Sequence, residues 1–459
     1  MREFLNCRNP VLPVQYHIPD GEAHVMPDGR VYVYGSWDEN EGDAMFCSDR
    51  YYVVSSKNMR DWTDHGLSFH SSWVPWTYDD NAPVYPEYSS LPRTFQPKAM
   101  EAPEGNDPPK GPKLDGPPLM FKTTLNAPDC IHKDGKYYMY FSMTDDREGV
   151  AVSDRPEGPF LDPVMLHCHG IDPAVFVDDD GQAYYYWGQF EARGAKLKDS
   201  MLELDETTIT PRLATETEHF FHEGASLRKR GDTYYFVYAG MERGKPSCIS
   251  YATSKSPLGP FEYRGIIIDN DGCDPADWNI HGSIEEVNGQ WYVFYHRTSR
   301  NVVGKRRLCI EPIFFSEDGS IPEVKMTSQG AGLPFGPGDT MCCYHHCGGT
   351  GTAYLDRYLA PAARQFDADG DEILTAIGEG DTICYRYFET AQELHTLQCE
   401  ALGSGTIRLY AGDTEVGHAV IEDGNQTASV CALLPGRHTL TLEFTDCQAL
   451  QFHRFSIAP

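Results

Sequence analysis

One short phrase recurs five times along the chain and restricts what this sequence can fold into. Each copy opens on a turn dipeptide such as Asp-Gly, or a near variant, and continues into alternating aromatic and β-branched residues, as in DGKYYMYFS. This pattern is typical of a tight turn that feeds a β-strand. A second strand-like phrase follows each copy, so the repeated unit is a small antiparallel sheet. The five copies begin at Asp28, Asp134, Asp180, Gly231 and Asn288.

The spacing of the copies predicts a β-propeller. The last four lie roughly 45 to 60 residues apart, which is the range of a four-stranded propeller blade. The first interval is longer, and its residues 67–125 are rich in proline and contain no hairpin phrase. We interpret this stretch as an insertion rather than a sixth blade. A five-bladed propeller over residues 1–330 follows, because radial closure of small sheets hides their edges and brings loops together on one central face.

The composition changes after the propeller. The stretch LPFGPGDTMC resembles a linker, and beyond it segments such as GTIRLYAGDTEVGHAVI and RHTLTLEFTD alternate apolar and polar residues between Gly, Asn and Asp turns. This predicts a β-sandwich over residues 340–459 and an all-β chain. All seven Trp lie at or before Trp291. We therefore expect the sandwich to have a structural role rather than to offer an aromatic platform for sugars.

Charge and cysteine content narrow the function. The chain has 68 acidic and 38 basic residues and a net charge of −30, which repels nucleic acid and anionic membranes and favours a neutral substrate. The first residues contain no apolar core of signal-peptide length, and no later stretch is long enough for a membrane helix, so we expect a cytosolic protein. Its 14 Cys are then expected to be reduced and mostly buried. The cluster CCYHHC at 342–347 suggests a metal site, although zinc sites usually present two separated ligand pairs.

Four carboxylates occupy the same place in the repeat, just upstream of a hairpin phrase. In a propeller the innermost strand of each blade lines the central channel, so these positions should converge although they lie far apart in sequence. Each residue alone could be a simple turn or cap. Together they point to function, because a buried carboxylate must be paired or protonated. The four are Asp20, Asp129, Asp172 and Glu223.

Several motifs in order resemble glycoside hydrolase family 43, whose members are five-bladed propeller enzymes that attack arabinose- and xylose-containing polysaccharides. The resemblance covers roughly residues 9–325 through PDGEAHV, APDCIHKDGKYYMYFS, GIDPAVFVDDDG, HEGASL and IHGSIEEVNGQWYVFYHR. It implies hydrolysis with inversion, which needs one carboxylate to deprotonate water and one protonated carboxyl to serve the leaving oxygen. The matching positions make Asp20 the base and Glu223 the acid. Asp172 would raise the proton affinity of the acid and orient it.

The resemblance also suggests residues around this centre. His281 matches a histidine that in many family members faces an axial cation, usually calcium, through water; it could equally be a core histidine. Arg297 could hydrogen-bond sugar hydroxyls, or form a surface ion pair. Trp37 and Trp187 are candidates for stacking on the sugar ring, although packing is the commoner role. We expect Asp129 to line the substrate site without carrying a proton.

The sequence therefore predicts an exo-acting α-L-arabinofuranosidase or β-xylosidase that trims oligosaccharides or polysaccharides. Endo-arabinanase is the second enzymatic reading. A non-catalytic sugar-binding propeller is the alternative from another class, although all three expected carboxylates are present. One departure from the family bears on the subsites, because Asn126 stands where many members have Trp before Ala-Pro-Asp.

Overall fold

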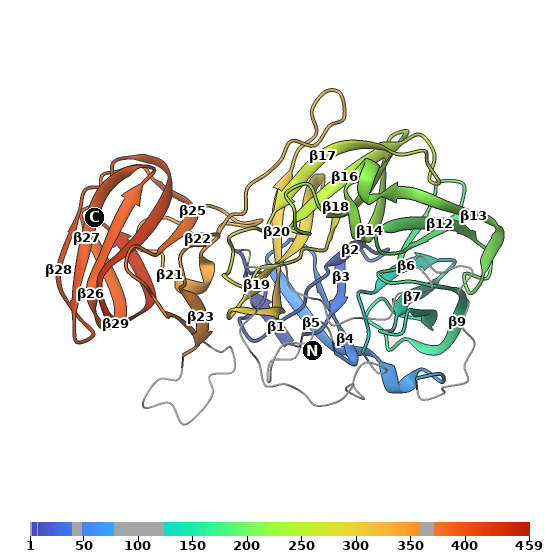
Figure 1. Ribbon diagram of the computed structural model, residues 1–459, viewed down its shortest axis with the longest axis horizontal. Coiled ribbons are helices and arrows are strands. Elements are labelled where there is room, and N and C mark those ends of the chain that lie inside the picture. Colours follow the sequence, from blue (N-terminus) through green and yellow to red (C-terminus); the bar gives the residue numbers. More distant parts are fainter. Residues whose placement is uncertain (1, 7, 39–47, 78–123, 359–370) are drawn as a thin grey trace.

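Five small antiparallel sheets stand around a common axis, and a further sheet lies beside them (Figure 1). The computed structural model describes residues 2–6, 8–38, 48–77, 124–358 and 371–459. Each hairpin phrase forms the second strand of a sheet, as the repeat predicts. Asp134 and Gly135 both have positive φ, 51° and 78°, as a two-residue turn matched to the twist of its strands requires. The five-bladed propeller is confirmed.

The blades follow one another along the chain. Blade 1 contains β1 (Arg2–Leu5), β2 (Glu22–Val25), β3 (Val31–Ser36), β4 (Arg50–Ser56) and β5 (Asp61–His70). Blade 2 contains β6 (Asp129–Lys133), β7 (Lys136–Ser142), β8 (Arg147–Ser153) and β9 (Leu161–His169). Blade 3 contains β10 (Ala174–Val177), β11 (Ala183–Trp187), β12 (Glu191–Leu197) and β13 (Leu204–Thr215). Blade 4 contains β14 (Phe221–Arg230), β15 (Thr233–Gly240), β16 (Cys248–Ser254) and β17 (Glu262–Asp269). Blade 5 contains β18 (Ser283–Val287), β19 (Gln290–Ser299) and β20 (Val302–Ile313).

The expected insertion begins later than the sequence suggested. Strand β5 extends to His70 and is followed by a short 3₁₀ turn, η1 (Ser71–Trp73). Most of the predicted range 67–125 lies in 78–123, outside the described residues. The other described helices are equally short: α1 (Glu216–His219) and η4 (Cys343–His345). No helix in the described ranges is long and apolar enough to cross a membrane.

The ring closes through the N-terminal segment rather than through a strand shared between the first and last blades. The Asn9 amide donates to the Ile310 carbonyl oxygen at 3.0 Å and accepts from the Ile310 N–H at 2.9 Å. A parallel bridge joins Gly21 to Gly282 beside the inner strands β2 and β18. Buried apolar side chains of the N-terminal segment, β3, β19 and β20 pack into one cluster at this junction.

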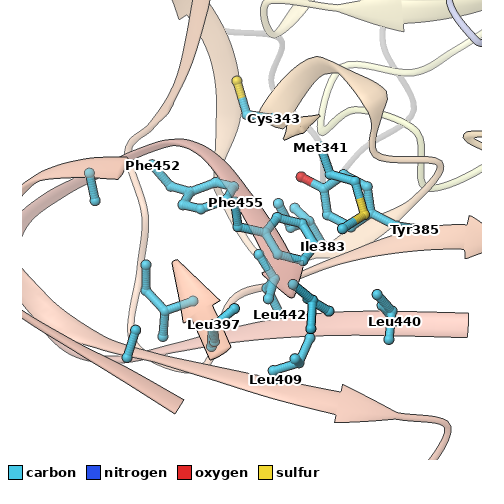
Figure 2. Close-up of a cluster of buried hydrophobic side chains, with 14 of the residues drawn as sticks. Met341, Cys343, Ile383, Tyr385, Leu397, Leu409, Leu440, Leu442, Phe452 and Phe455 are labelled. Atoms are coloured by element: carbon cyan, nitrogen blue, oxygen red, sulfur yellow. The ribbon is translucent and has the colours of Figure 1, made fainter. Parts of the chain in front are cut away.

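The C-terminal sheet folds over into the two layers of a β-sandwich. Its two longest strands pair with each other, and the register of this pairing shifts at several places where the strands bend. Its strands are β21 (Met341–Cys342), β22 (Gly349–Thr350), β23 (Tyr354–Arg357), β24 (Glu372–Thr375), β25 (Thr382–Thr390), β26 (Thr396–Ala411), β27 (Thr414–Glu422), β28 (Asn425–Cys431) and β29 (Gly436–Ala458). Their inward side chains form one apolar core (Figure 2). The predicted boundary at 330–340 falls in the strand-free stretch between β20 and β21 and stays a prediction.

Buried ion pairs tie the sandwich to blade 5. Arg300 lies just before β20 and Arg307 lies on it. Both guanidinium groups bond to the carboxylate of Glu372 at the start of β24, and the Arg300 Nε bond is 2.8 Å long. Glu372 is fully buried, so removing it would leave two buried cations without this partner.

Candidate active site

Three of the predicted carboxylates come together where the inner strands begin. Asp20 precedes β2, Asp172 precedes β10, and Glu223 lies near the start of β14. Nδ1 of His281 lies 3.8 Å from an Asp20 oxygen and 3.8 Å from an Asp172 oxygen. The charge of Glu223 acts directly on Asp172. Residues far apart in the sequence therefore form a single polar cluster on the propeller axis.

The backbone at this cluster is held in unusual conformations. Asp20 and Asp172 both have left-handed φ values, 59° and 53°. Such residues carry a conformational cost and persist where the surrounding structure holds them, often at functional sites. Gly224 has φ 71° and packs so closely on His281 that a Cβ atom would approach the ring to 2.8 Å. The glycine that follows Glu223 on β14 therefore lets Glu223 enter the cluster beside His281.

Asp20 is held in its ionised form. Its side chain is almost completely buried, and Nη1 of Arg306 donates to Oδ1 at 3.0 Å. Burial raises the pKa of Asp20, but the Arg306 guanidinium, followed by the hydrogen bond with His296, outweighs burial and holds this pKa well below its usual range. Arg306 is itself fixed by two bonds of 2.9 Å to the buried carboxylate of Asp38. A proton acceptor that stays charged is what a general base requires.

Asp172 has the opposite environment. Burial raises its pKa well above the usual range, and the charges of Glu223 and then Asp20 add to this effect. The backbone of Ala127 acts in the opposite direction on this pKa but does not outweigh burial. Glu223 is the most accessible of the three, with 15% of its side chain exposed, and Oε2 accepts a bond of 2.7 Å from the Gln189 amide. Burial and the neighbouring charges therefore favour the protonated form of Asp172.

Asp129 does not line this site. Oδ1 lies 2.7 Å from His24 Nε2, and Oδ2 accepts from the Val175 N–H at 2.7 Å, in a side chain that is 1% exposed. It belongs to a second axial cluster that contains Glu22 and Arg228. The expected contact with substrate is wrong for this reason: the carboxylate is already used to join blades 1, 2 and 3.

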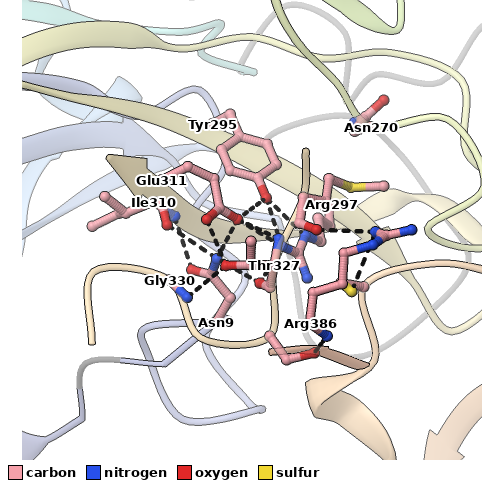
Figure 3. A network of polar contacts seen from close by, with 12 residues as sticks. Asn9, Asn270, Tyr295, Arg297, Ile310, Glu311, Thr327, Gly330 and Arg386 are labelled. Carbon is pink, nitrogen blue, oxygen red and sulfur yellow. Dashed lines mark hydrogen bonds and ion pairs between the residues drawn. The ribbon is translucent and has the colours of Figure 1, made fainter. Parts of the chain in front are cut away.

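Arg297 also points away from the three carboxylates. Its guanidinium donates to Tyr295 Oη, to Glu311 and to the Thr327 carbonyl oxygen, at the junction with the C-terminal part (Figure 3). Successive side chains of a strand point to opposite faces, so on β19 it is His296 that reaches Asp20, with a distance of 3.4 Å between Nδ1 and Oδ1. Arg297 therefore does not lie among the three carboxylates, where the sequence analysis expected it to meet the sugar.

The two tryptophan predictions have different outcomes. Trp187 is fully buried and stacks on Tyr185 in the apolar core between blades, so it cannot pack against a sugar. Trp37 is partly buried and stacks on Tyr52 with ring centres 4.3 Å apart. Its contact with substrate stays a prediction.

Four site residues escaped the sequence analysis: Asp38, Gln189, His296 and Arg306. Asp38 and Arg306 carry no local motif, and their roles depend on a contact between blades 1 and 5. Strand alternation could have assigned His296 and Arg306 to one face only if the register of blade 5 had been known.

Comparisons with known proteins point to the same family as the sequence motifs. The family model described as "Glycosyl hydrolases family 43" matches residues 110–321. A "Xylosidase/arabinosidase" of Thermoclostridium stercorarium is 31% identical over an alignment of 445 residues. The match covers 83% of this chain and 82% of that protein. A family 43 β-xylosidase/α-arabinofuranosidase from a compost microbial metagenome, solved with xylotriose in a calcium-free form, has 27% identity and a TM-score of 0.52 over 70% of this chain and 98% of its own.

A further solved structure extends the likeness in fold to the C-terminal part. An arabinoxylan arabinofuranohydrolase from Bacillus subtilis, 23% identical, covers 99% of this chain and 97% of its own with a TM-score of 0.50. With the propeller, the axial carboxylates and a relative that matches most of its length, the chain belongs to glycoside hydrolase family 43.

Proposed function

We propose that this glycoside hydrolase removes terminal arabinofuranosyl or xylosyl residues from oligosaccharides or polysaccharides with inversion at the anomeric carbon. The observation that carries the proposal is the convergence of Asp20, Asp172 and Glu223 around His281. The substrate class is supported by relatives named xylosidase/arabinosidase in Thermoclostridium stercorarium and Humicola insolens.

Asp20 acts as the general base in this mechanism. Its carboxylate stays ionised through Arg306 and lies in a nearly buried position, where it can accept a proton from the water that attacks the anomeric carbon. His296 accepts a hydrogen bond from the Asp20 backbone N–H on Nδ1 at 3.3 Å, which holds the backbone of Asp20 at this place.

Glu223 acts as the general acid, because it is the one carboxyl of the three with an accessible side chain. It donates its proton to the oxygen of the departing sugar. Burial and then the charge of Glu223 raise the pKa of the neighbouring Asp172 well above its usual range. In this proposal Asp172 orients the acid. The Gln189 amide keeps the Glu223 carboxyl in a single orientation.

A calcium ion on the axis, faced by His281, forms part of the proposal. His281 Nδ1 lies 3.8 Å from a carboxylate oxygen of Asp20 and 3.8 Å from one of Asp172. These distances exceed a direct hydrogen bond, so water or a hydrated ion would bridge the groups. When bound, calcium would favour the ionised carboxylates electrostatically. The Glu22, His24 and Asp129 cluster does not fit a metal, since Nη2 of Arg228 lies 2.7 Å from Glu22 Oε1 and supplies the positive charge. Calcium-dependent thermal stabilisation that is lost in His281→Ala tests the proposed site.

The function is tested with p-nitrophenyl α-L-arabinofuranoside and β-D-xyloside. The parent protein is compared with Asp20→Asn and Glu223→Gln, and with Glu218→Gln, an exposed glutamate close by, as the matched control. Loss of a general acid or base typically costs about 10²- to 10⁴-fold in rate. We expect a loss of that size for Asp20→Asn on these glycosides and for Glu223→Gln on xylo-oligosaccharides, no loss in the control, and inverted product in the proton spectrum of the parent reaction.

The outcomes separate the readings. Full activity in Glu223→Gln on xylo-oligosaccharides, whose leaving groups need protonation, would overturn the acid assignment. A parent that spares both glycosides but shortens linear arabinan is an endo-arabinanase. A parent that binds these sugars and hydrolyses none is a non-catalytic propeller.

A further inference from the structure

Two cysteines meet at the junction between the propeller and the sandwich. Cys347 follows the 3₁₀ turn η4, and Cys384 lies on β25, 37 positions later in the chain. Their sulfur atoms are 3.8 Å apart. Cys347 is fully buried, whereas Cys384 is partly exposed. The site of hydrolysis uses neither residue.

The backbones of the two residues are paired. The Cys347 N–H donates to the Cys384 carbonyl oxygen at 2.8 Å, and the Cys384 N–H donates to the Gly348 carbonyl oxygen at 2.8 Å. The register of β22 and β25 pairs Gly349 with Ile383 and so places Gly348 opposite Cys384, which makes the two cysteines diagonal neighbours whose sulfur atoms lie 3.8 Å apart. The sulfur atoms can therefore reach bonding distance by side-chain rotation.

Two arginines surround Cys347 with positive charge. Nη1 of Arg386 donates to its sulfur at 3.5 Å, and the Arg297 guanidinium lies on the other side of the same junction (Figure 3). Burial raises the pKa of the Cys347 thiol, but the hydrogen bond from Cys384, the Arg297 charge and the Arg386 charge outweigh burial and lower this pKa. The thiolate is the nucleophilic form of cysteine, so the pair contains one activated sulfur and one thiol.

The neighbouring histidine and cysteine of the CCYHHC motif do not make this a metal site. The ring nitrogens of His346 lie 2.8 Å from the Cys343 carbonyl oxygen and 3.0 Å from the Cys273 carbonyl oxygen. Cys343 donates to the Glu372 carbonyl oxygen at 3.1 Å. Within the described part of the chain, the one group of three ligand atoms close enough to share a metal is on the propeller axis.

We propose that Cys347 and Cys384 form a reversible disulfide with a low-molecular-weight disulfide, such as glutathione disulfide, as the oxidant. The accessible Cys384 sulfur attacks the small disulfide while its proton passes to Cys347. One small thiolate leaves, and Cys384 carries a mixed disulfide. The small thiolate takes the proton from Cys347, whose sulfur then attacks Cys384 and expels the second small thiolate. Counted from two thiols, the protein loses two protons and two electrons, which reduce the small disulfide to two thiols.

The experiment uses the full chain incubated with glutathione disulfide, followed by alkylation of the remaining thiols and peptide mapping without reduction. We expect one cross-linked peptide pair that contains residues 347 and 384, a protein lighter by two hydrogen atoms, and full reversal with dithiothreitol. At alkaline pH, where solvent hydroxide can take the Cys384 proton in place of Cys347, Cys347→Ser should trap glutathione on Cys384, because the resolving sulfur is missing. Cys431→Ser, another buried sandwich cysteine, is the matched control and should behave as the parent.

The parent protein alone can overturn the proposal, whatever the variants do. Complete alkylation of Cys347 and Cys384 after oxidation would show that the pair does not form. A cross-link from either residue to Cys342 or Cys343 would show that the wrong partner was assigned. In a folded Cys347→Ser protein, the absence of glutathione on Cys384 would refute the order of the two steps.

Discussion

Replacing Arg306 by Met should move the acidic limb of the pH–rate profile. In the parent protein the guanidinium donates to Asp20 at 3.0 Å inside a nearly solvent-free site. A buried hydrogen bond to a charged group contributes about 1.5–3 kcal/mol, and one pKa unit corresponds to about 1.36 kcal/mol. Loss of this bond should therefore raise the pKa of Asp20 by about one to two units.

The sign follows from the proposed role of Asp20 as base. Catalysis needs the ionised carboxylate, so kcat/KM falls as the pH drops through the pKa of Asp20. A higher pKa moves that fall to higher pH. In Arg306→Met we expect the limb to shift upward by about one to two pH units relative to the parent. Arg306→Lys keeps the positive charge and is the matched control, with a smaller shift.

The assay is kcat/KM against pH on the p-nitrophenyl glycosides, with circular dichroism to confirm folding. The substitution also leaves Asp38 without its bidentate partner, and breaking a buried ion pair typically costs about 3–5 kcal/mol, so the measurements belong well below the melting temperature. A folded Arg306→Met protein whose acidic limb coincides with that of the parent would refute either the identity of the base or the role of Arg306.

Three further predictions test the elements that hold the site. Glu372→Gln should lower the free energy of unfolding by about 3–5 kcal/mol, because it removes the charge that compensates Arg300 and Arg307. Denaturant titration measures this change, and an unchanged midpoint would contradict it. Arg228→Met should destabilise the propeller by a similar amount, since its guanidinium bonds carboxylates of blades 1 and 5; scanning calorimetry should show a lower melting temperature, and an unaltered one would argue against the axial cluster as a clasp. Gln189→Leu should reduce kcat/KM by about tenfold, the value of one charged hydrogen bond, with Gln189→Asn as the control; equal rates in all three proteins would remove Gln189 from the positioning of Glu223.

The repeat made the fold predictable. Hairpin phrases depend on local chemistry, because turn residues with positive φ and alternating aromatic residues specify a hairpin wherever they occur. Several successive copies leave few ways to bury the sheets other than radial closure. The sequence for the same reason predicted Asp20, Asp172 and Glu223, since each stands at an equivalent place in its blade.

The tertiary structure decided which side chains meet. A strand presents alternate residues to opposite faces, so a shift of one residue exchanges His296, which reaches Asp20, for Arg297, which faces the sandwich. Arg306 and Arg307 are separated in the same way. No motif reports this register, because it is set by how β20 packs against blade 1 after the ring has closed.

Depth along the axis was also decided by the tertiary structure. Asp129 lies five residues before its hairpin phrase, whereas Asp172 lies eight residues before its own, and the Asp129 side chain bonds to His24 and the Val175 N–H instead of joining the cluster around His281. The sequence by itself determined that acidic residues would converge on the propeller axis. Only the folded ring decided that Asp20 is charged beside Arg306 and that Asp129 joins blades, because burial and charged neighbours from distant segments set the state of each carboxylate.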